Sequence, residues 1–226
     1  MKPYYEDKLV KLYNCKAVEY IDYAKHRVDG AVTVTDPPFN VNYHYNEYED
    51  NLKDIEYLAM LGRNVILPCV LIHYPETTFR FAQYISKCPT RCVAWVYPSN
   101  TRRQWRMVSW FGCKPDFSLV KGQYKNPTDK RVKGLIDKGK APNLYDWWEI
   151  NQVKNVSKEK TKHPCQMPLE IMKNIVGITP AKVIYDPFAG SGTTLVAAKM
   201  LGRQAIGVEL SEEYAEICAK RLSVVS

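Results

Sequence analysis

The amino-acid sequence predicts an α/β fold with a mostly parallel sheet and helices on both of its faces. Short β-branched runs alternate with segments of helical periodicity along most of the 226 residues. A strand–loop–helix–strand unit of about 30 residues closes the chain, and such a unit builds half of a doubly wound sheet. Both observations favour parallel strands joined by helical crossovers.

The N-terminal half contains three candidate strands and two candidate helices. The first strand is β-branched and ends at Asp36-Pro37-Pro38, because proline cannot donate to a sheet ladder. The turn that follows it is therefore rigid. We expect strands over residues 30–35, 64–67 and 92–97, and helices over residues 56–61 and 77–86.

The composition changes between residues 115 and 162, where glycine, lysine, asparagine and proline become frequent. This stretch is too irregular for a core element and too long for a simple connection, so we expect a functional insertion. Regular structure resumes beyond it, with Gly177 as a helix stop and Ser211 as an N-cap. The expected elements are helices over residues 168–176, 193–201 and 211–222, and strands over residues 182–185 and 204–208.

Length and composition bound the class of protein. The chain is long enough for one domain over residues 1–226, with the insertion at 115–162 inside it. Its apolar runs are shorter than a membrane span and its first residues lack the apolar core of a signal peptide, so we expect a cytoplasmic protein with no membrane association. Seven scattered cysteines indicate free thiols, and the spacing of the four histidines predicts no metal site.

A net charge of +8 is the first indication of an anionic partner. The basic residues gather in the run 102–106 and then recur from Lys121 to Lys162, whereas the chain beyond Leu210 is closer to balanced. A basic surface favours nucleic acid without proving it, because many basic proteins bind none.

One informative segment follows a candidate strand and opens a candidate helix: Asp186-Pro187-Phe188-Ala189-Gly190-Ser191-Gly192-Thr193-Thr194. Its glycines allow the backbone to turn sharply and approach a ligand, and the helix presents unpaired amides. Glu209, at the end of the next strand, suits hydrogen bonding to two ribose hydroxyls. The loop lacks both the dinucleotide pattern Gly-x-Gly-x-x-Gly and a phosphate loop's Gly-Lys-Ser/Thr, so an adenosyl ligand without phosphates fits better. A tight βα turn is the alternative for the loop on its own.

A second informative segment is Thr35-Asp36-Pro37-Pro38-Phe39-Asn40. The Asp36 carboxylate and the Pro37 carbonyl can accept the two hydrogens of an amino group, and the Phe39 ring can stack on a planar base. By itself such a segment is usually only a turn. The tyrosine-rich loop that follows, residues 41–48, either moves over the site and flanks a bound base or packs on the domain surface.

Together these segments resemble the β-class of DNA amino-methyltransferases, in which an Asp-Pro-Pro-Tyr/Phe motif precedes a Phe-x-Gly-x-Gly motif. The segment Lys162-His163-Pro164-Cys165-Gln166-Met167-Pro168 is similar to the family's Lys-His-Pro-x-Gln-Lys-Pro, and Asp146-Trp147-Trp148 resembles its Asp-x-Trp stretch. The resemblance covers roughly residues 30–45 and 160–222. It implies a Rossmann-like methyltransferase sheet with a circularly permuted motif order, in which both motifs end neighbouring strands and face one pocket.

The resemblance also implies a cofactor, S-adenosylmethionine, and a set of site residues. The implied catalytic residues are Asp36, Pro37, Pro38 and Phe39. The implied cofactor-binding residues are Asp186, Phe188, Ala189, Gly190, Ser191, Gly192, Thr193, Thr194, Glu209, His163, Pro164 and Gln166. The residues expected to bind nucleic acid are Arg102, Arg103, Arg106, Lys121, Lys125, Lys130, Arg131 and Lys133, most of them in the insertion where the family places target recognition. Two positions depart from the family pattern: Met167, and Lys16, which stands where an Asp often contacts the cofactor adenine.

The implied function is transfer of a methyl group to the N6 amino group of adenine in double-stranded DNA, with the base flipped out of the helix, as in restriction–modification enzymes. Asp rather than Ser before Pro-Pro favours adenine N6 over cytosine N4 by family tendency. The small insertion, and the family's habit of dimerising, favour a homodimer. The alternatives are a cytosine-N4 methyltransferase, an RNA or protein methyltransferase, and a non-catalytic protein that binds DNA.

Overall fold

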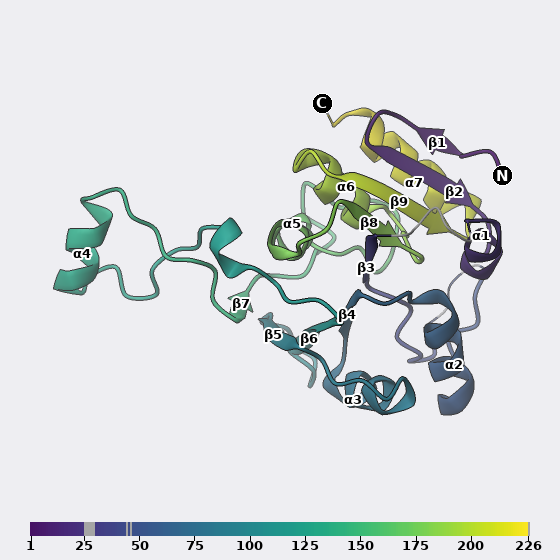
Figure 1. The fold of residues 1–226 in the computed structure, drawn as a ribbon, viewed down its shortest axis with the longest axis horizontal. Coiled ribbons are helices and arrows are strands. Elements are labelled where there is room, and N and C mark those ends of the chain that lie inside the picture. The colour runs from purple at the N-terminus through teal and green to yellow at the C-terminus, as the bar shows by residue number, and fades with distance from the viewer. Residues whose placement is uncertain (25–29, 44, 46, 226) are drawn as a thin grey trace.

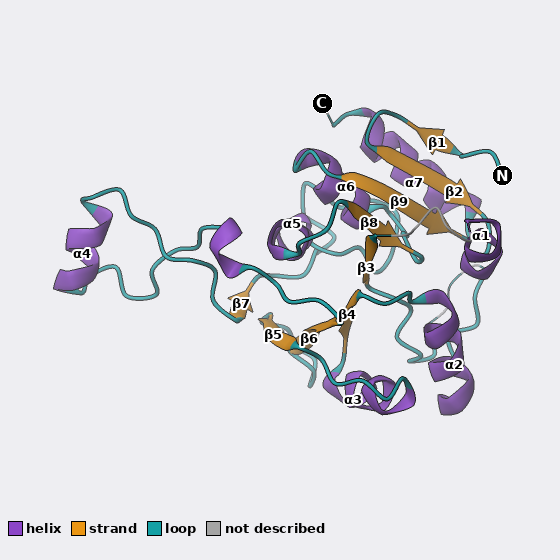
Figure 2. Ribbon diagram, viewed as in Figure 1, coloured by secondary structure: helices purple, strands orange, loops and turns teal. Residues whose placement is uncertain are grey.

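The computed structural model describes residues 1–24, 30–43, 45 and 47–225. Over these residues one sheet of nine strands runs through the molecule, in the order β1-β2-β9-β8-β3-β4-β6-β5-β7 (Figures 1 and 2). The strands are β1 (Tyr5–Glu6), β2 (Val10–Asn14), β3 (Ala31–Thr35), β4 (Cys69–His73), β5 (Arg91–Val96), β6 (Trp105–Phe111), β7 (Trp147–Glu149), β8 (Val183–Asp186) and β9 (Gln204–Glu209).

Helices cover both faces of the sheet, as the sequence predicts. Alternate residues of β4 point to opposite faces, so that Val70 and Ile72 share a core with α5, α6 and α7, whereas Cys69 and Leu71 share one with α2 and α3. The helices are α1 (Ala17–Ala24), α2 (Asp54–Asn64), α3 (Pro75–Tyr84), η1 (Phe117–Leu119), α4 (Lys130–Ile136), α5 (Leu169–Ile178), α6 (Thr193–Met200) and α7 (Glu212–Ser223).

The centre of the sheet is parallel and fully buried. The strands β2, β9, β8, β3 and β4 are parallel to one another, and every residue of β3 and β4 is buried. Burial on both faces explains why these strands are almost continuously apolar or β-branched. The two strands that carry the motifs, β3 and β8, are neighbours, with Ala31 opposite Val183 and Thr33 opposite Tyr185. The predicted adjacency of the two motifs is therefore confirmed.

One predicted strand and one predicted helix end are wrong. Residues 64–67 form no strand: Asn64 ends α2, and the next strand, β4, begins at Cys69. The Asn64 side chain donates to the Met60 carbonyl at 2.8 Å, which ties this residue to the last turn of the helix. Gly177 does not stop α5, which continues to Ile178. A Cβ at position 177 would lie 2.6 Å from the Val120 side chain, so this glycine serves close packing.

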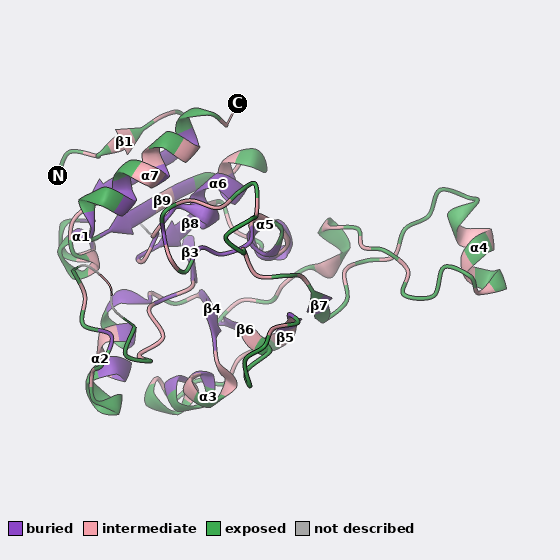
Figure 3. Ribbon diagram, turned by 180° about the vertical axis from the view of Figure 1, so that it is seen from behind, coloured by how far each residue is buried: buried purple, intermediate pink, exposed green. Residues whose placement is uncertain are grey.

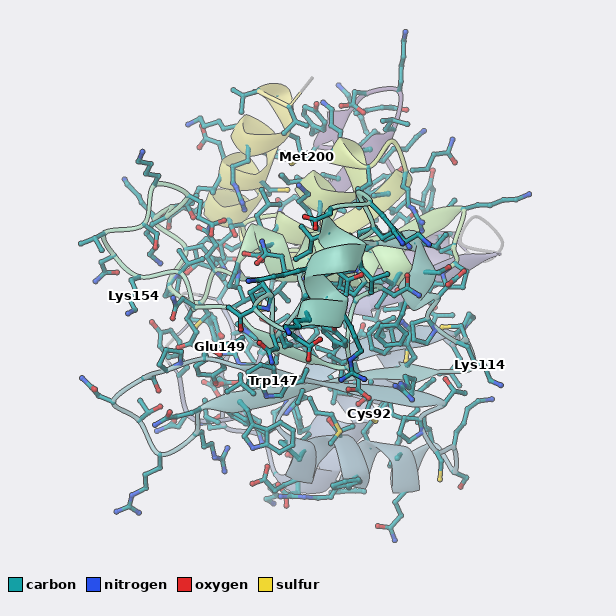
Figure 4. All side chains as sticks on the ribbon, turned by 90° about the vertical axis from the view of Figure 1, so that its left-hand side faces the viewer. Cys92, Lys114, Trp147, Glu149, Lys154 and Met200 are labelled. Carbon is teal, nitrogen blue, oxygen red and sulfur yellow. The ribbon has the colours of Figure 1, made fainter. Side chains whose placement is uncertain are left out.

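The stretch 115–162, expected to be an insertion without a core element, contributes β7 to the sheet, with Trp148 buried, and also contains an arm that projects from the body. We define the projecting arm as residues 121–143, closed at its base by the bridge between Lys121 and Asn143 and tipped by α4. The structure describes all of these residues, and none is buried, in contrast to the strands of the body (Figure 3). They include seven Lys or Arg and two Asp. Figure 4 views the molecule from the arm's side, with Lys114 and Lys154 on opposite flanks of the body.

Candidate active site

A cavity of about 620 Å³ lies where the carboxyl ends of β2, β3, β8 and β9 meet. Its walls include the turn after β3, the loop after β8, the end of β9 and the start of α1. Open α/β sheets place their ligands at this edge. The volume lies within the range of small-molecule sites, roughly 300–1,000 Å³.

The glycine loop after β8 is held by a carboxylate at the end of β9. Glu209 accepts hydrogen bonds from the Gly190 amide at 2.7 Å and from the Ser211 amide at 2.9 Å. Burial raises the pKa of Glu209 to about 7, although these amides favour its ionised form. Glu209 also lines the cavity, and a carboxylate has lone pairs beyond the two that these amides use. It therefore positions the loop and can still accept from a ligand hydroxyl.

Both glycines of this loop have left-handed backbone conformations, for different reasons. Gly190 has a φ of +52°, and a Cβ there would lie 2.9 Å from His163 Nε2. Gly192 has a φ of +77° and begins α6, where a Cβ would lie 2.1 Å from Cys218 Sγ. Gly190 thus keeps a wall of the cavity open, whereas Gly192, which does not line the cavity, lets α6 pack on α7.

Asp186 joins the two motif strands below the cavity. Its Oδ1 accepts from the Thr35 hydroxyl at 2.7 Å and from the Phe188 amide at 3.1 Å. Burial raises the pKa of Asp186, and hydrogen bonds from Thr194 and Thr35 oppose that shift. The turn after β3 and the loop after β8 are therefore oriented by one shared carboxylate.

The turn after β3 is held by a chain of hydrogen bonds from α2 and β4. The Tyr57 hydroxyl donates to the Pro38 carbonyl at 2.5 Å and lies 2.8 Å from His73 Nε2. His73 Nδ1 accepts from the Tyr74 amide at 2.7 Å. An imidazole that accepts at Nδ1 carries its proton on Nε2, so His73 donates to Tyr57, which donates to Pro38.

The same histidine supports the aromatic residue of the turn. The His73 and Phe39 rings stack with centroids 4.2 Å apart and an angle of 21° between their planes. Burial, together with the charge of Arg106, lowers the pKa of His73 to about 3, so the imidazole is neutral at physiological pH. Neutrality preserves both the stacking contact and the hydrogen bond to Tyr57.

Asp36 begins this turn and faces the cavity. Its side chain is 13% exposed, and its Oδ1 lies 3.6 Å from Arg106 Nη1. Burial raises the pKa of Asp36 to about 7; Arg106 lowers it and Asp186 raises it. At neutral pH the carboxyl group is therefore close to its titration midpoint, suited to accepting a hydrogen bond or a proton.

The tyrosine-rich loop, as far as the structure describes it, borders the cavity. Tyr43, Tyr45 and Tyr48 line it, and residues 44 and 46 lie outside the described part of the chain. Its base is fixed, because the Asp50 carboxylate accepts from the amides of Asn40, Val41 and Tyr43 at 2.7–3.1 Å. Whether the loop moves over a bound base stays a prediction.

The Lys162–Pro168 segment forms a further wall, beside the tyrosine-rich loop, since Cys165 is hydrogen-bonded to Tyr45. His163 lines the cavity and meets the Tyr214 ring edge-on, with centroids 4.4 Å apart. Burial lowers the pKa of His163 to about 4. Gln166 lies outside the cavity; it accepts from the Thr161 amide at 2.8 Å and donates to the Glu159 carbonyl at 2.7 Å, which fixes the loop. Pro164 also lies outside the cavity lining.

The structure brings most of the expected site residues together. All four residues of Asp36–Phe39 and nine of the twelve expected cofactor residues line the cavity, the exceptions being Pro164, Gln166 and Gly192. The residues expected to bind nucleic acid separate into three groups. Arg102 and Arg103 lie between β5 and β6, Lys121 to Lys133 lie on the projecting arm, and Arg106 lies inside the cavity.

Sequence reasoning missed several residues of the site. Tyr57 and His73 hold the turn, while Tyr214 and Cys165 line the cavity. Tyr57, His73 and Tyr214 lie on three separate helices and strands and form no local motif, whereas Cys165 is the variable position of the Lys162–Pro168 segment. The sequence places Arg106 only in a basic run; because side chains alternate along a strand, it lies on the same face of β6 as the buried Val108 and Trp110, which turns it inward.

In the described ranges no three His, Cys, Asp or Glu side chains are grouped so that they could hold a metal ion. In the same ranges no helix has both the length and the apolar character needed to cross a membrane.

The permuted α/β sheet and a cavity between an Asp-Pro-Pro-Phe turn and a glycine loop define a class of protein, the amino-methyltransferases that act on nucleobases. A model of the DNA methylase family matches residues 67–220, more than half of the chain. The chain therefore belongs to that family, the S-adenosylmethionine-dependent DNA amino-methyltransferases of the N6/N4 type. The match begins after the Asp36 turn, so the place of that turn in the site comes from the geometry above.

Curated proteins and solved structures agree with this assignment. The chain is 27% identical to the Type II methyltransferase M.ScaI of Streptomyces caespitosus over 98% of its own length and 84% of that protein. It is 27% identical to the Type II methyltransferase M.BglII of Bacillus subtilis, over 95% of this chain and 69% of that protein. It is 43% identical to the Type II methyltransferase M2.DpnII of Streptococcus pneumoniae, over only 35% of this chain and 30% of that protein.

Solved structures show the same fold. The M1.HpyAVI–SAM complex superposes with a TM-score of 0.60 and 24% identity, over 94% of this chain and 100% of that one. The cytosine-N4-specific PvuII DNA methyltransferase superposes with a TM-score of 0.66 and 18% identity, over 97% of this chain and 88% of that one. The Rossmann-like architecture is therefore confirmed.

Proposed function

We propose that this DNA amino-methyltransferase acts on the N6 amino group of adenine in double-stranded DNA and takes the base out of the helix to do so. The observation that carries the proposal is the pairing of β3 with β8, which brings Asp36 and the glycine loop to the walls of one cavity. The Asp36 side chain is only 13% exposed, out of reach of a stacked base, so the base must flip, which costs a few kcal/mol. Asp in place of Ser before Pro-Pro supports adenine over cytosine.

The cavity fits the family's methyl donor. S-adenosylmethionine, when bound, supplies an electrophilic methyl group. Gly190 leaves beside His163 a space that a Cβ would fill, and Glu209 offers a carboxylate to two ribose hydroxyls. In the described part of the chain the buried His163 Nδ1 and Ser211 Oγ have no hydrogen-bond partner, and buried polar atoms of this kind favour a ligand that completes them. We therefore assign cofactor binding to the glycine loop, Glu209 and His163.

Asp36 is assigned the central catalytic role. An exocyclic amino group is a poor nucleophile because its lone pair is delocalised into the base. The Asp36 carboxylate and the Pro37 carbonyl accept its two hydrogens and favour a tetrahedral nitrogen with a localised lone pair. With S-adenosylmethionine bound, the bond between its sulfur and the methyl carbon would break, its electron pair staying on sulfur, as the nitrogen lone pair forms the new bond. The nitrogen would then be positively charged, and the Asp36 carboxylate would accept one of its hydrogens as a proton. Pro38 and Phe39, held by Tyr57 and His73, position that carboxylate.

We propose that the insertion at 115–162 recognises the target and that the projecting arm contacts DNA phosphates through its Lys and Arg side chains. Figure 1 shows α4 at the far end of the molecule from α1, whose first residues line the cavity. None of the arm residues lines the cavity, so we do not expect the arm tip to touch a base bound in the cavity of its own subunit. It suits phosphates further along the duplex, or DNA held by a second copy. The second arrangement requires a homodimer, which we propose to act in the cytoplasm on genomic DNA.

The test supplies isotopically labelled S-adenosylmethionine with genomic DNA that lacks methylated bases, digests the DNA to nucleosides and identifies the labelled nucleoside by mass. Label in N6-methyldeoxyadenosine supports the proposal and allows the target site to be mapped. Label in N4-methyldeoxycytidine would show that the target base is cytosine and would leave the proposed mechanism unchanged. RNA and protein are tested as substrates in parallel assays. Label in RNA or protein, or no label in any of the three substrates, refutes DNA as the proposed substrate. The matched control is Asp36→Asn, which keeps the shape of the side chain and loses its charge.

A further inference from the structure

Arg106 lies where neither a surface role nor a purely structural role explains it. It is the second residue of β6, opposite Trp95 of β5, and its side chain is 15% exposed. Its Nη1 lies 3.6 Å from Asp36 Oδ1, beyond hydrogen-bond distance, and both Asp36 Oδ1 and Arg106 Nε are buried without a hydrogen-bond partner among the described residues. The charges are paired, but the contact is loose.

The guanidinium also covers the aromatic residue of the turn. Its central carbon lies 4.5 Å from the centroid of the Phe39 ring and 5.1 Å from that of Trp95. The His73 imidazole stacks on Phe39 at 4.2 Å and fills one face of the ring. The guanidinium must therefore lie over the other face, which is the face that a base needs for stacking.

A guanidinium shares its recognition chemistry with an aminated heterocycle. Both are planar and delocalised, both carry in-plane N–H donors that suit a carboxylate, and both stack on aromatic rings. We propose that Arg106 is an internal surrogate for the target base, occupying the place of the amino group beside Asp36 and of the ring over Phe39 until the flipped base displaces it. This inference rests on the proposed function.

The surrogate role explains two features of the base-free site. An unpaired ionised carboxylate whose side chain is largely buried is costly, and the guanidinium offsets that cost. A fully hydrogen-bonded pair would be hard to separate, whereas a pair 3.6 Å apart exchanges readily for a closer donor. The Tyr97 hydroxyl and the Met167 sulfur also contact the guanidinium and remain as its partners when Asp36 is taken.

The test compares wild type with Arg106→Met and Arg106→Lys, at saturating cofactor, on a duplex that carries the mapped site. Arg106→Met fills the space without donors or charge. We expect the KM of this variant for DNA to fall several-fold at pH 9, because no guanidinium has to be displaced by the base. We also expect the acid limb of its kcat/KM profile to shift to higher pH by about one unit or more, because Asp36 loses the neighbouring positive charge. Arg106→Lys keeps the charge without the planar fork, so its acid limb stays near the wild-type position while its KM falls.

Two results would overturn the role. If Arg106→Met lowers kcat and raises KM for DNA at every pH with its acid limb unmoved, the guanidinium stays in place and contacts the base. If the variant only loses thermal stability, with KM and the acid limb as in wild type, Arg106 is structural. An inactive wild type in the same assay refutes the proposed function as well, whereas an active wild type beside a contradictory Met variant refutes the surrogate alone.

A second measurement does not depend on how the Met variant folds. Wild-type protein labelled with ¹⁵N-arginine is bound to S-adenosylhomocysteine and to the target duplex, and the Arg106 Nε resonance is identified by its loss in Arg106→Lys. We expect this resonance to shift with the intact duplex and to keep its free-protein position with a duplex that is abasic at the target. An equal shift with both duplexes would show that DNA binding moves Arg106 without the base, and would overturn the proposal.

Discussion

The Thr35 hydroxyl donates to the Asp186 carboxylate at 2.7 Å, across the boundary between two strands that lie 151 residues apart in the sequence. This buried bond ties the strand that ends in the catalytic turn to the strand that ends in the glycine loop. The two halves of the site are thus positioned by a contact that neither motif reveals alone.

Thr35→Val removes this bond while conserving shape, and leaves a buried carboxylate oxygen with one donor fewer. We expect the free energy of unfolding to fall by about 1–3 kcal/mol and the cofactor affinity to fall with it. Chemical denaturation and calorimetric titration with S-adenosylmethionine measure the two quantities. Thr101→Val, on an exposed turn, is the control, and a wild-type cofactor affinity in Thr35→Val would contradict the coupling.

Tyr57→Phe breaks the hydrogen-bond chain to the Pro38 carbonyl and keeps the aromatic ring. The turn then loses its fixed orientation, so kcat should fall about tenfold while the dissociation constant of the cofactor stays near the wild-type value. Single-turnover kinetics and cofactor titration separate these effects. Tyr4→Phe, at a position that is 41% exposed, serves as the control. Equal losses of kcat and cofactor binding would indicate general unfolding of the site.

The activity should have an acid limb set by Asp36. Burial raises the pKa of this carboxyl group to about 7, and only its ionised form accepts the amino hydrogens, so kcat/KM should fall as the pH drops through about 7. His73 and His163, with pKa values of about 3 and 4, stay neutral there and add no limb. Because Glu209 is assigned to cofactor binding, rates measured at saturating S-adenosylmethionine do not reflect its titration. A flat profile between pH 6 and 9 would contradict the assignment.

Glu209→Gln tests the junction between β9 and the glycine loop. The amide nitrogen of glutamine is a donor and would face the amide of Gly190 or Ser211, each of which now donates to a carboxylate oxygen. We expect cofactor affinity to fall at least tenfold, with kcat at saturating cofactor affected less. Isothermal titration checks this, and unchanged affinity would refute the role of Glu209 in the cofactor site.

Replacing Lys130, Arg131 and Lys133 on α4 with glutamine tests the arm. If the arm binds phosphates, the slope of log K against log salt should become shallower by about 0.9 for each phosphate that the variant no longer neutralises, with cofactor affinity unchanged. Fluorescence anisotropy on a duplex carrying the mapped site supplies the slope. The control replaces the exposed residues Lys2, Lys8 and Lys182. An identical slope in both triple variants would remove α4 from the DNA interface.

The sequence predicts the parallel core and the meeting of the two motifs, because burial of β3 and β8 imposes apolar, β-branched runs and proline and glycine mark where those runs end. It does not predict the contacts that organise the site. Tyr57, His73 and Arg106 reach the turn at residues 36–39 from other elements, and a buried tyrosine or histidine looks like any other core residue in a sequence. The wrong stop at Gly177 has the same cause, since packing against Val120 is invisible locally.

The projecting arm has a consequence for how this enzyme can diverge. The chain enters and leaves the arm at one narrow neck, the bridge between Lys121 and Asn143, and none of the residues between them is buried. Lys125 contacts the Trp147 ring of β7, so we expect insertions or deletions beyond Lys125 to leave the pairing of β5 with β7 undisturbed. The arm is therefore a replaceable module: a graft from another source can join at the neck and inherit an intact chemical centre.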